Sequence, residues 1–238
     1  MASKVRKAVG LLQRPRFVQA ILAHRVAAAP EHMEAIRICG ANTLLDVGAN
    51  KGQFSLTFRA LQPNARIFAF EPLPSAADTF ERMFHRDEHA RLHRVALASA
   101  EGSASFHIAD RPDSSSLLMP GKGQELAFGV RESRTIHVPV SRLDRCIDLV
   151  NLAHPVLLKV DVQGGELDVF EGCSQLDCVD FIYVELSYVE LYVGQPLFQQ
   201  VSAYLDSRGF GVAGIFNQVI TSEFGPTQVD VLFRRRTI

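Results

Sequence analysis

From residue 43 onward, short apolar runs alternate with segments whose apolar residues recur at helical spacing. The apolar runs, which predict buried strands, cover residues 43–48, 66–71, 91–98, 156–162 and 181–186. The segments between several of them, such as residues 53–61 and 74–85, have the periodicity of amphipathic helices. Alternation of this kind predicts parallel strands joined by right-handed crossovers, and therefore a doubly wound α/β sheet.

The two ends of the chain depart from this alternation. Residues 1–41 are predicted to form an N-terminal helical arm, because Phe17, Ile21 and Leu22 lie one turn apart and Pro30 precedes a second helical stretch. At the other end, residues 210–216 and 228–235 predict two strands separated by a turn-rich stretch, which permits antiparallel pairing. We therefore expect residues 42–238 to form one domain with a seven-stranded, mostly parallel sheet, a C-terminal antiparallel hairpin and helices on both faces.

The middle of the chain is less regular. Residues 103–108 predict an added strand, and residues 110–134, rich in Ser, Gly, Pro and charge, predict a long loop. Ser141 is placed to cap a helix that runs to Leu149.

A glycine loop follows the first predicted strand. Gly48 and Gly52 leave room for a ligand beside the backbone N–H groups that open the next helix. Asn50 stands where a dinucleotide-binding loop would have its second glycine, which disfavours a pyrophosphate. Asp46 would place a carboxylate in the crevice, where it suits the sulfonium and ammonium of S-adenosylmethionine. The loop therefore predicts S-adenosylmethionine as the cofactor.

Glu71 ends the second predicted strand, about 20 residues past the glycine loop. An acidic residue at this place in an α/β fold accepts hydrogen bonds from ribose hydroxyls. Pro72 follows it and stiffens the turn. We expect Glu71 and Pro72 to contact the cofactor, together with Phe54 in the first turn of the helix after the glycine loop.

Three carboxylates form the candidate catalytic group. Asp161 and Glu185 close two apolar strands, and Glu166 opens a short helix after two glycines. Such a cluster could deprotonate or orient a hydroxyl, or hold a divalent ion through oxygen ligands, and Glu166 could instead only interact with its helix dipole. Asp161 is our first choice for a general base, and His137 is the alternative outside the carboxylates.

Two tyrosines, Tyr188 and Tyr192, follow the strand that Glu185 closes. Their rings could stack on the apolar face of a sugar, or they could simply pack against the next helix.

These features occur in a characteristic order. The motifs are Asp46-Val47-Gly48-Ala49-Asn50-Lys51-Gly52, Phe70-Glu71-Pro72, Ser114-Ser115-Ser116-Leu117, Leu143-Asp144, Lys159-Val160-Asp161-Val162-Gln163-Gly164-Gly165-Glu166, Val184-Glu185 and Tyr192-Val193-Gly194-Gln195-Pro196-Leu197. Over residues 42–235 the chain resembles the FkbM family of methyltransferases.

The resemblance implies a class I methyltransferase fold and methyl transfer to an oxygen, typically a hydroxyl of a sugar or a secondary metabolite. It implies that Asp46, Gly48, Asn50 and Glu71 contact the cofactor, that Ala96 and Leu97 lie near the adenine, and that Ser115 and Ser116 line the site. We also expect Gly52 and Asp161 to contact the cofactor. The family often has a carboxylate where this chain has Gln163. If this position contacts the substrate or a metal, an uncharged amide makes that contact in this chain.

The numbers of charged residues and cysteines limit the classes of binding partner and substrate that we expect. Lys plus Arg and Asp plus Glu number 25 and 26, so no global field attracts nucleic acid, and we expect a small-molecule or glycan acceptor. The four cysteines form no CxxC pair or zinc-ligand spacing, which is typical of reduced thiols in the cytoplasm. No apolar run approaches the roughly 20 residues that span a bilayer. A divalent metal is possible at the carboxylates but is not expected. The sequence does not indicate an oligomeric state.

Two other function classes stay open at this point. A nicotinamide-dependent oxidoreductase would use the same strand, loop and helix, and Glu71 as well, although Asn50 and the absence of a Tyr-x-x-x-Lys-type pair count against it. A relative that binds the cofactor without turnover would keep the same motifs.

Overall fold

The computed structural model describes residues 15–236 and contains a seven-stranded sheet with the order β3-β2-β1-β7-β8-β10-β9. All pairs except two are parallel; β10 runs antiparallel to both β8 and β9. The strands are β1 (Thr43–Val47), β2 (Arg66–Phe70), β3 (Ala90–His93), β7 (Val156–Val160), β8 (Phe181–Ser187), β9 (Phe210–Thr221) and β10 (Gly225–Arg235). The predicted sheet, with its C-terminal antiparallel hairpin, is confirmed.

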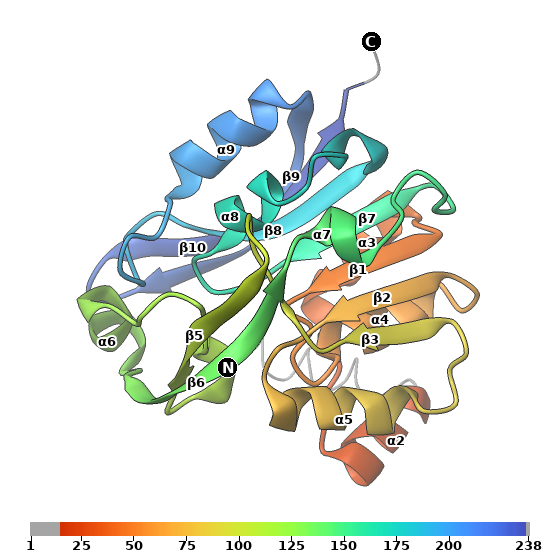
Figure 1. Cartoon of the computed structure of the whole chain (residues 1–238), viewed down its shortest axis with the longest axis horizontal. Helices are drawn as coiled ribbons and strands as arrows, with labels where there is room; N and C mark the ends of the chain where they lie inside the picture. The colour runs from red at the N-terminus through yellow and green to blue at the C-terminus, as the bar shows by residue number, and fades with distance from the viewer. Residues whose placement is uncertain (1–14, 237–238) are drawn as a thin grey trace.

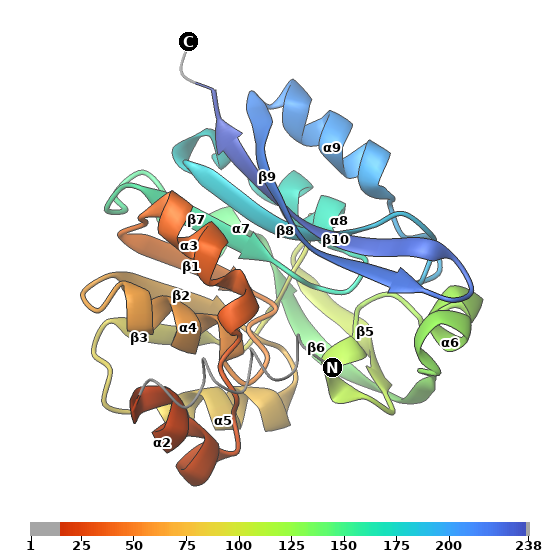
Figure 2. The same cartoon turned by 180° about the vertical axis from the view of Figure 1, so that it is seen from behind.

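Helices cover both faces of this sheet (Figures 1 and 2). One face is covered by α2 (Pro15–His24), η1 (Pro30–His32), α3 (Met33–Cys39), α4 (Gln53–Leu61) and α5 (Pro74–Phe84). The other is covered by α7 (Leu143–Cys146), α8 (Glu166–Glu171), η3 (Leu176–Cys178) and α9 (Phe198–Ser207).

The central strands β1, β7 and β8 are buried on both sides, and their alternating side chains pack into two separate cores. Leu45 and Val47 of β1 pack in the core under α8 and α9, whereas Leu44 packs in the core under α3 and α4. Asp46 follows Leu44 by two positions, so the pleat turns its carboxylate toward the α3–α4 side. The same alternation decides where the polar side chains of the other strands point.

The N-terminal segment is part of the same packed body. Phe17 of α2 and Ile36 of α3 are fully buried in the core under α3 and α4. The predicted helices of the arm are thus present from residue 15 onward, with a 3-10 turn at residues 30–32 before α3. Residues 1–14 of the predicted arm and residues 237–238 of the predicted domain lie outside the described residues.

A second sheet of three strands stands beside the first, in the order β4-β6-β5 (Figure 1). It comprises β4 (Ala96–Leu97), β5 (Gly102–Ala109) and β6 (Glu132–Ser141). The predicted third strand, residues 91–98, is therefore wrong in one respect. Its first half joins β2 as β3, and its second half leaves the large sheet to pair with β6.

The prediction that residues 110–134 form one long loop is also wrong. The segment contains η2 (Pro112–Ser114) and α6 (Lys122–Phe128) before β6 begins at Glu132. Gly121 and Gly123 lie so close to Leu191 and Glu190 that a Cβ on Gly123 would come within 2.0 Å of the Glu190 carbonyl oxygen. This close backbone contact holds α6 against the loop after β8. The small residues of this segment are typical of a loop in sequence, but here they allow the close packing.

The predicted cap at Ser141 is wrong as well. Ser141 is the last residue of β6, and α7 begins at Leu143 after Arg142, without a side-chain cap, and ends at Cys146. Arg142 instead makes a two-pronged ion pair with Asp144, at 3.0 and 2.7 Å, which holds the start of this short helix.

Candidate functional site

One large cavity opens at the carboxyl ends of the parallel strands. Its volume is about 700 Å³, within the usual range for small-molecule sites. The strand order reverses between β1 and β7, and ligands of open α/β sheets bind at such a switch point. The lining comes from segments as distant as Ala27 and Asp230.

The glycine loop after β1 forms one end of the cavity. Gly48, Asn50 and Gly52 all have left-handed backbone, with φ of 73°, 49° and 89°. A Cβ on Gly48 would lie 1.9 Å from the carbonyl oxygen of Asp161, so only glycine lets the loops after β1 and β7 pack together. Gly52 does not line the cavity. Its missing Cβ makes room for Phe80 and Met83 of α5, each 2.8 Å from where that atom would be.

Glu71 is buried at the same end and lines the cavity. Its two carboxylate oxygens accept hydrogen bonds from the backbone N–H groups of Asn50 and Leu73, both at 2.8 Å. Burial raises the pKa of Glu71 to about 7, and these two N–H groups and the charge of Lys159 oppose that rise. Glu71 thus ties the glycine loop to the turn after β2.

An apolar slot continues from Glu71. Leu73, Ala96, Leu97 and Phe106 are buried and line the cavity, with Leu117 beside them. Two of them, Ala96 and Leu97, come from β4, so the departure of this short strand from the large sheet is what creates this wall.

Asp46 does not line the cavity, contrary to the sequence-based expectation. It is fully buried, its Oδ2 accepts a hydrogen bond from Ser55 at 2.6 Å, and Lys159 Nζ lies 3.2 Å from its Oδ1. Lys159 Nζ also donates to the Gly48 carbonyl at 2.8 Å. Although burial lowers the pKa of Lys159, the charges of Asp46 and Asp161 outweigh it and hold that pKa above its ordinary value. The charge of Asp46 is therefore already paired within the protein.

Asp161 and Glu185 do lie together at the cavity wall, as expected. The Asp161 side chain is 40 % exposed, which leaves it accessible to a ligand, and Lys159 Nζ lies 3.8 Å from it. Glu185 is more enclosed, and Gln228 Nε2 donates to its Oε2 at 2.8 Å. Burial, reinforced by the charges of Asp161 and Asp230, raises the pKa of Glu185 well above its ordinary value.

Glu166 lies behind this wall. Its Oε1 accepts hydrogen bonds from the backbone N–H groups of Gly164 at 2.9 Å and Val162 at 3.3 Å, and it is 3 % exposed. Burial raises the pKa of Glu166 to about 7. The position of this carboxylate gives it no access to the cavity, and it organises the turn between β7 and α8.

The remaining candidate residues also separate into those that line the cavity and those that lie behind its wall. The predicted site residues that line the cavity are Gly48, Asn50, Phe54, Glu71, Pro72, Ala96, Leu97, Ser115, Asp161 and Glu185. Ser116 is buried behind Ser115, where its hydroxyl donates to the Val162 carbonyl at 3.1 Å.

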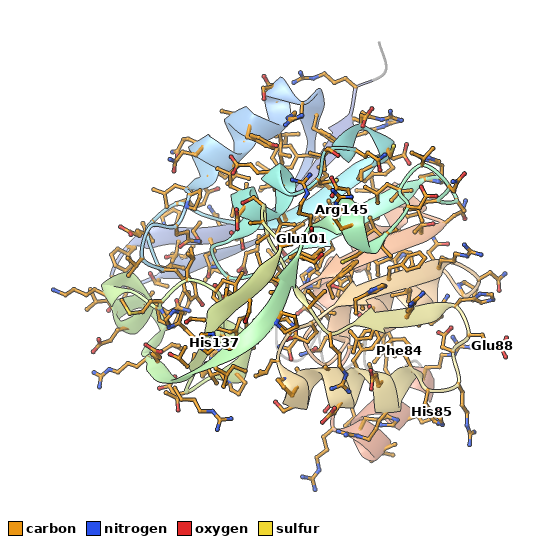
Figure 3. The ribbon with its side chains drawn as sticks, viewed as in Figure 1. Phe84, His85, Glu88, Glu101, His137 and Arg145 are labelled. Atoms are coloured by element: carbon orange, nitrogen blue, oxygen red, sulfur yellow. The ribbon has the colours of Figure 1, made fainter. Side chains whose placement is uncertain are left out.

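The alternative base His137 and the two candidate tyrosines, Tyr188 and Tyr192, do not line the cavity. His137 lies exposed on β6 of the small sheet (Figure 3). The Tyr188 ring packs on Phe198, and Tyr192 is fully buried.

The structure adds residues that the sequence did not indicate. His32, Tyr183 and Asp230 also line the cavity, and we refer to this cluster together with Glu185 as its far end. His32 Nδ1 lies 3.0 Å from the Tyr183 hydroxyl and 3.4 Å from Asp230 Oδ2, and the Tyr183 hydroxyl donates to Asp230 at 2.9 Å. The one available signal was the polar residues at alternate positions of apolar strands, Lys159 on β7 and Asp230 on β10.

Among residues 15–236, no group of three or more His, Cys, Asp or Glu side chains is arranged to hold a metal ion. Within the same residues, every helix is too short or too polar to cross a membrane.

Comparison with known proteins gives a consistent result. A family model described as the methyltransferase FkbM domain matches residues 46–212. "Methyltransferase 1" of Beauveria bassiana is 30 % identical over 183 residues, which cover 71 % of this chain and 72 % of that protein. "2-O-methyltransferase NoeI" of Sinorhizobium fredii is 34 % identical, over 64 % of this chain and 66 % of its own. "Hexuronic acid methyltransferase AglP" of Haloferax volcanii is 30 % identical, over 61 % and 56 %.

Proposed function

The chain belongs to the FkbM family of methyltransferases, and from that premise we propose that it methylates a hydroxyl oxygen of a sugar or a related small molecule. It is an S-adenosylmethionine-dependent methyltransferase. The observation that carries the proposal is one cavity with Glu71 at one end and the accessible carboxylate of Asp161 farther along its wall. Two relatives support it, since one is named a 2-O-methyltransferase and the other a hexuronic acid methyltransferase.

The residues of the glycine-loop end fit S-adenosylmethionine. The apolar slot of Ala96, Leu97 and Phe106 suits an adenine ring, and the carboxylate of Glu71 suits the ribose hydroxyls. Gly48 and Asn50 offer main-chain groups to the amino-acid part of the cofactor. The cofactor supplies an electrophilic methyl group on a sulfonium.

Asp161 has the properties of the group that receives the acceptor proton. A hydroxyl is a weak nucleophile at neutral pH, and a carboxylate within hydrogen-bond reach makes its oxygen more nucleophilic as the proton leaves. Asp161 is exposed to the cavity; Lys159 Nζ lies 3.8 Å from its Oδ2, and Gln163 Nε2 donates a hydrogen bond to its Oδ1 at 2.7 Å. The acceptor oxygen would gain the methyl group as the methyl–sulfur bond breaks and S-adenosylhomocysteine leaves, and the acceptor proton would pass to Asp161.

The far end of the cavity favours a neutral or cationic acceptor over a nucleic acid. Glu185, Asp230 and Asp161 line the cavity there. Of the cations in the lining, Lys159 is engaged by Asp46, and Arg111 lies 3.7 Å from Asp113. A phosphodiester would meet carboxylates at short range, and like charges in a partly buried site repel strongly. The nearly balanced net charge of the chain, −1, offers no compensating field.

The test uses S-adenosylmethionine with a ¹³C-labelled methyl group and a panel of neutral, amino and acidic methyl glycosides. We expect a methyl ether with at least one neutral or amino glycoside. Asp161→Asn should lower kcat by about 100-fold or more, as loss of a general base does, while binding of S-adenosylhomocysteine persists. Asp177→Asn, a substitution of an exposed aspartate far from the cavity lining, is the matched control.

Near-normal turnover by Asp161→Asn would reject Asp161 as the base. Cofactor binding without methyl transfer to any glycoside would instead favour the non-catalytic relative.

A further inference from the structure

Gln163 occupies an unusual place beside the candidate base. It lies in the turn between β7 and α8 with a left-handed backbone, φ 61°, and Gly164 follows with φ 102°. Such backbone is costly for a residue with a side chain, and residues held in it cluster at functional sites. The turn brings the Gln163 side chain into the cavity wall.

The amide nitrogen of Gln163 bridges the two carboxylates of that wall. Nε2 lies 2.7 Å from Asp161 Oδ1 and 3.2 Å from Glu185 Oε2. A primary amide has two N–H donors, so each carboxylate can receive one of them. The bridge joins a residue after β7 to a residue of β8.

The amide oxygen of Gln163 faces a hydroxyl. Oε1 lies 2.9 Å from the Tyr192 hydroxyl, which is equally far from the Ser114 carbonyl and receives a hydrogen bond from Gln124 Nε2 at 2.8 Å. A reversed amide would turn its oxygen toward two carboxylates and its N–H groups away from them. The surroundings therefore select one orientation of the Gln163 amide.

The residues behind Gln163 are rigidly held. Tyr192 is fully buried and Gln124 is 3 % exposed, and Gln124 belongs to α6, the helix of the inserted segment. The Pro120–Tyr192 bridge and the hydrogen bond from Val193 N to Met119 O dock this segment on the loop after β8. A chain of hydrogen bonds thus runs from α6 through Tyr192 to the two carboxylates.

We propose that Gln163 is a positioning residue of the methyl-transfer site, whose amide holds Asp161 and Glu185 side by side while Tyr192 and Gln124 fix the orientation of that amide. The inference rests on the proposed function for its purpose, but its structural content is independent of the acceptor.

The pair needs such a bridge because of its surroundings. Glu185 is partly buried in the cavity wall, and the charged groups that face it are Asp161, Asp230 of β10 and Glu166 of α8. Burial first, and these charges second, raise the pKa of Glu185, while the hydrogen bond from Gln163 lowers it. Removal of the amide therefore makes the charged form of Glu185 less stable.

The test is a titration of the Glu185 carboxyl by ¹³C NMR, with glutamate labelled at the side-chain carboxyl and the signal assigned with Glu185→Gln. In Gln163→Leu we expect the midpoint to rise by about one pH unit, which is the scale of one lost charge-assisted hydrogen bond. Tyr192→Phe keeps the buried ring but removes the hydroxyl, and should shift the midpoint in the same direction by less.

Matched controls lie elsewhere in the fold. Gln218→Leu on β9 and Tyr204→Phe on α9 should leave the Glu185 midpoint where it is. If Gln163→Leu failed to fold, Tyr192→Phe would decide. An unchanged midpoint in the folded Gln163 variant, or in Tyr192→Phe when only that variant folds, would overturn the proposal.

The activity measurement separates the two proposals. Gln163→Leu should lower kcat about tenfold with little change in the KM for S-adenosylmethionine, because the amide positions the base and does not hold the cofactor. Wild-type protein without methyl transfer would defeat the proposed function, and the NMR midpoint would still decide the role of Gln163.

Discussion

The two ends of the cavity are built in different ways. The polar part of the glycine-loop end consists of near neighbours in sequence. Main-chain N–H groups of the loop donate there to the Phe70 carbonyl and to the carboxylate of Glu71. The far end consists of side chains from distant segments: His32 precedes the first strand, and Asp230 lies on the strand before the C-terminus. The first end is a local motif, and the second exists only once the sheet has formed.

The difference has an energetic side. The glycine-loop end presents main-chain dipoles to the ligand, and Glu71 is the one charged side chain named there that is buried. The far end places Lys159, Glu185 and Asp230 on one face of the sheet, under α4 and η1, and Asp46 lies behind the cavity wall on the same face. Charges there are stable only when they are paired or hydrogen-bonded. The opposite face of the same strands is an uninterrupted apolar core.

Lys159 connects the two ends, and its removal should have the largest effect. Its Nζ lies 2.8 Å from the Gly48 carbonyl, 3.2 Å from Asp46 and 3.8 Å from Asp161. Lys159→Met leaves Asp46 as an unpaired buried charge, which should lower the free energy of unfolding by about 3–5 kcal/mol in urea denaturation.

The double variant Asp46→Asn with Lys159→Met should recover a large part of that loss, since no charge is then left unpaired. Lys122→Met, which removes an exposed lysine of α6, is the control. A loss below 1 kcal/mol in Lys159→Met would show that the buried pair does not join the two ends.

Glu166 tests the far end through pH. Its pKa in the folded protein is raised from 4.5 to about 7 by burial, so its proton is held more tightly in the folded state than in the unfolded one. The stability this provides is complete below pH 4.5 and is lost as the pH rises through 7. We expect the unfolding free energy of the wild type to fall by about 2–3 kcal/mol more than that of Glu166→Gln between pH 5 and 8.

Glutamine at position 166 can still accept the hydrogen bonds from Val162 and Gly164 through its one oxygen, so the variant should fold. Glu171→Gln, at the end of the same helix, should follow the wild type. Parallel pH curves for Glu166→Gln and wild type would contradict the assignment.

Most of the fold could be predicted from the periodicity of the apolar residues and from the order in which strands and helices alternate. Parallel strands buried on both faces gave continuous apolar runs, as in residues 156–160, and the terminal hairpin followed from two strands with a turn between them. The predictions failed where packing overrides composition. Gly121 and Gly123 were interpreted as loop residues, but they lie against the backbone after β8 and dock α6.

The residues of the candidate site fall into two groups: those that a local motif predicts and those that only the folded sheet brings together. Residues near the glycine loop were predicted from a motif, and Gly48, Asn50 and Glu71 line the cavity. Asp46 belongs to the same motif, yet the pleat turns it under α4 toward Lys159. The polar position of Asp230 in an apolar strand was a signal, but its meeting with His32 could not be predicted, because no local pattern records which segments become neighbours in the fold.

The central claim is that the glycine-loop end holds the cofactor and the far end holds the acceptor. The most direct measurement is calorimetric titration with S-adenosylhomocysteine of wild type, Glu71→Gln and Asp230→Asn, each first shown to be folded by thermal unfolding. The account predicts that Glu71→Gln weakens binding about tenfold, the scale of one lost hydrogen bond to a charged group, and that Asp230→Asn leaves it unchanged. Full affinity in Glu71→Gln together with a loss in Asp230→Asn would contradict it.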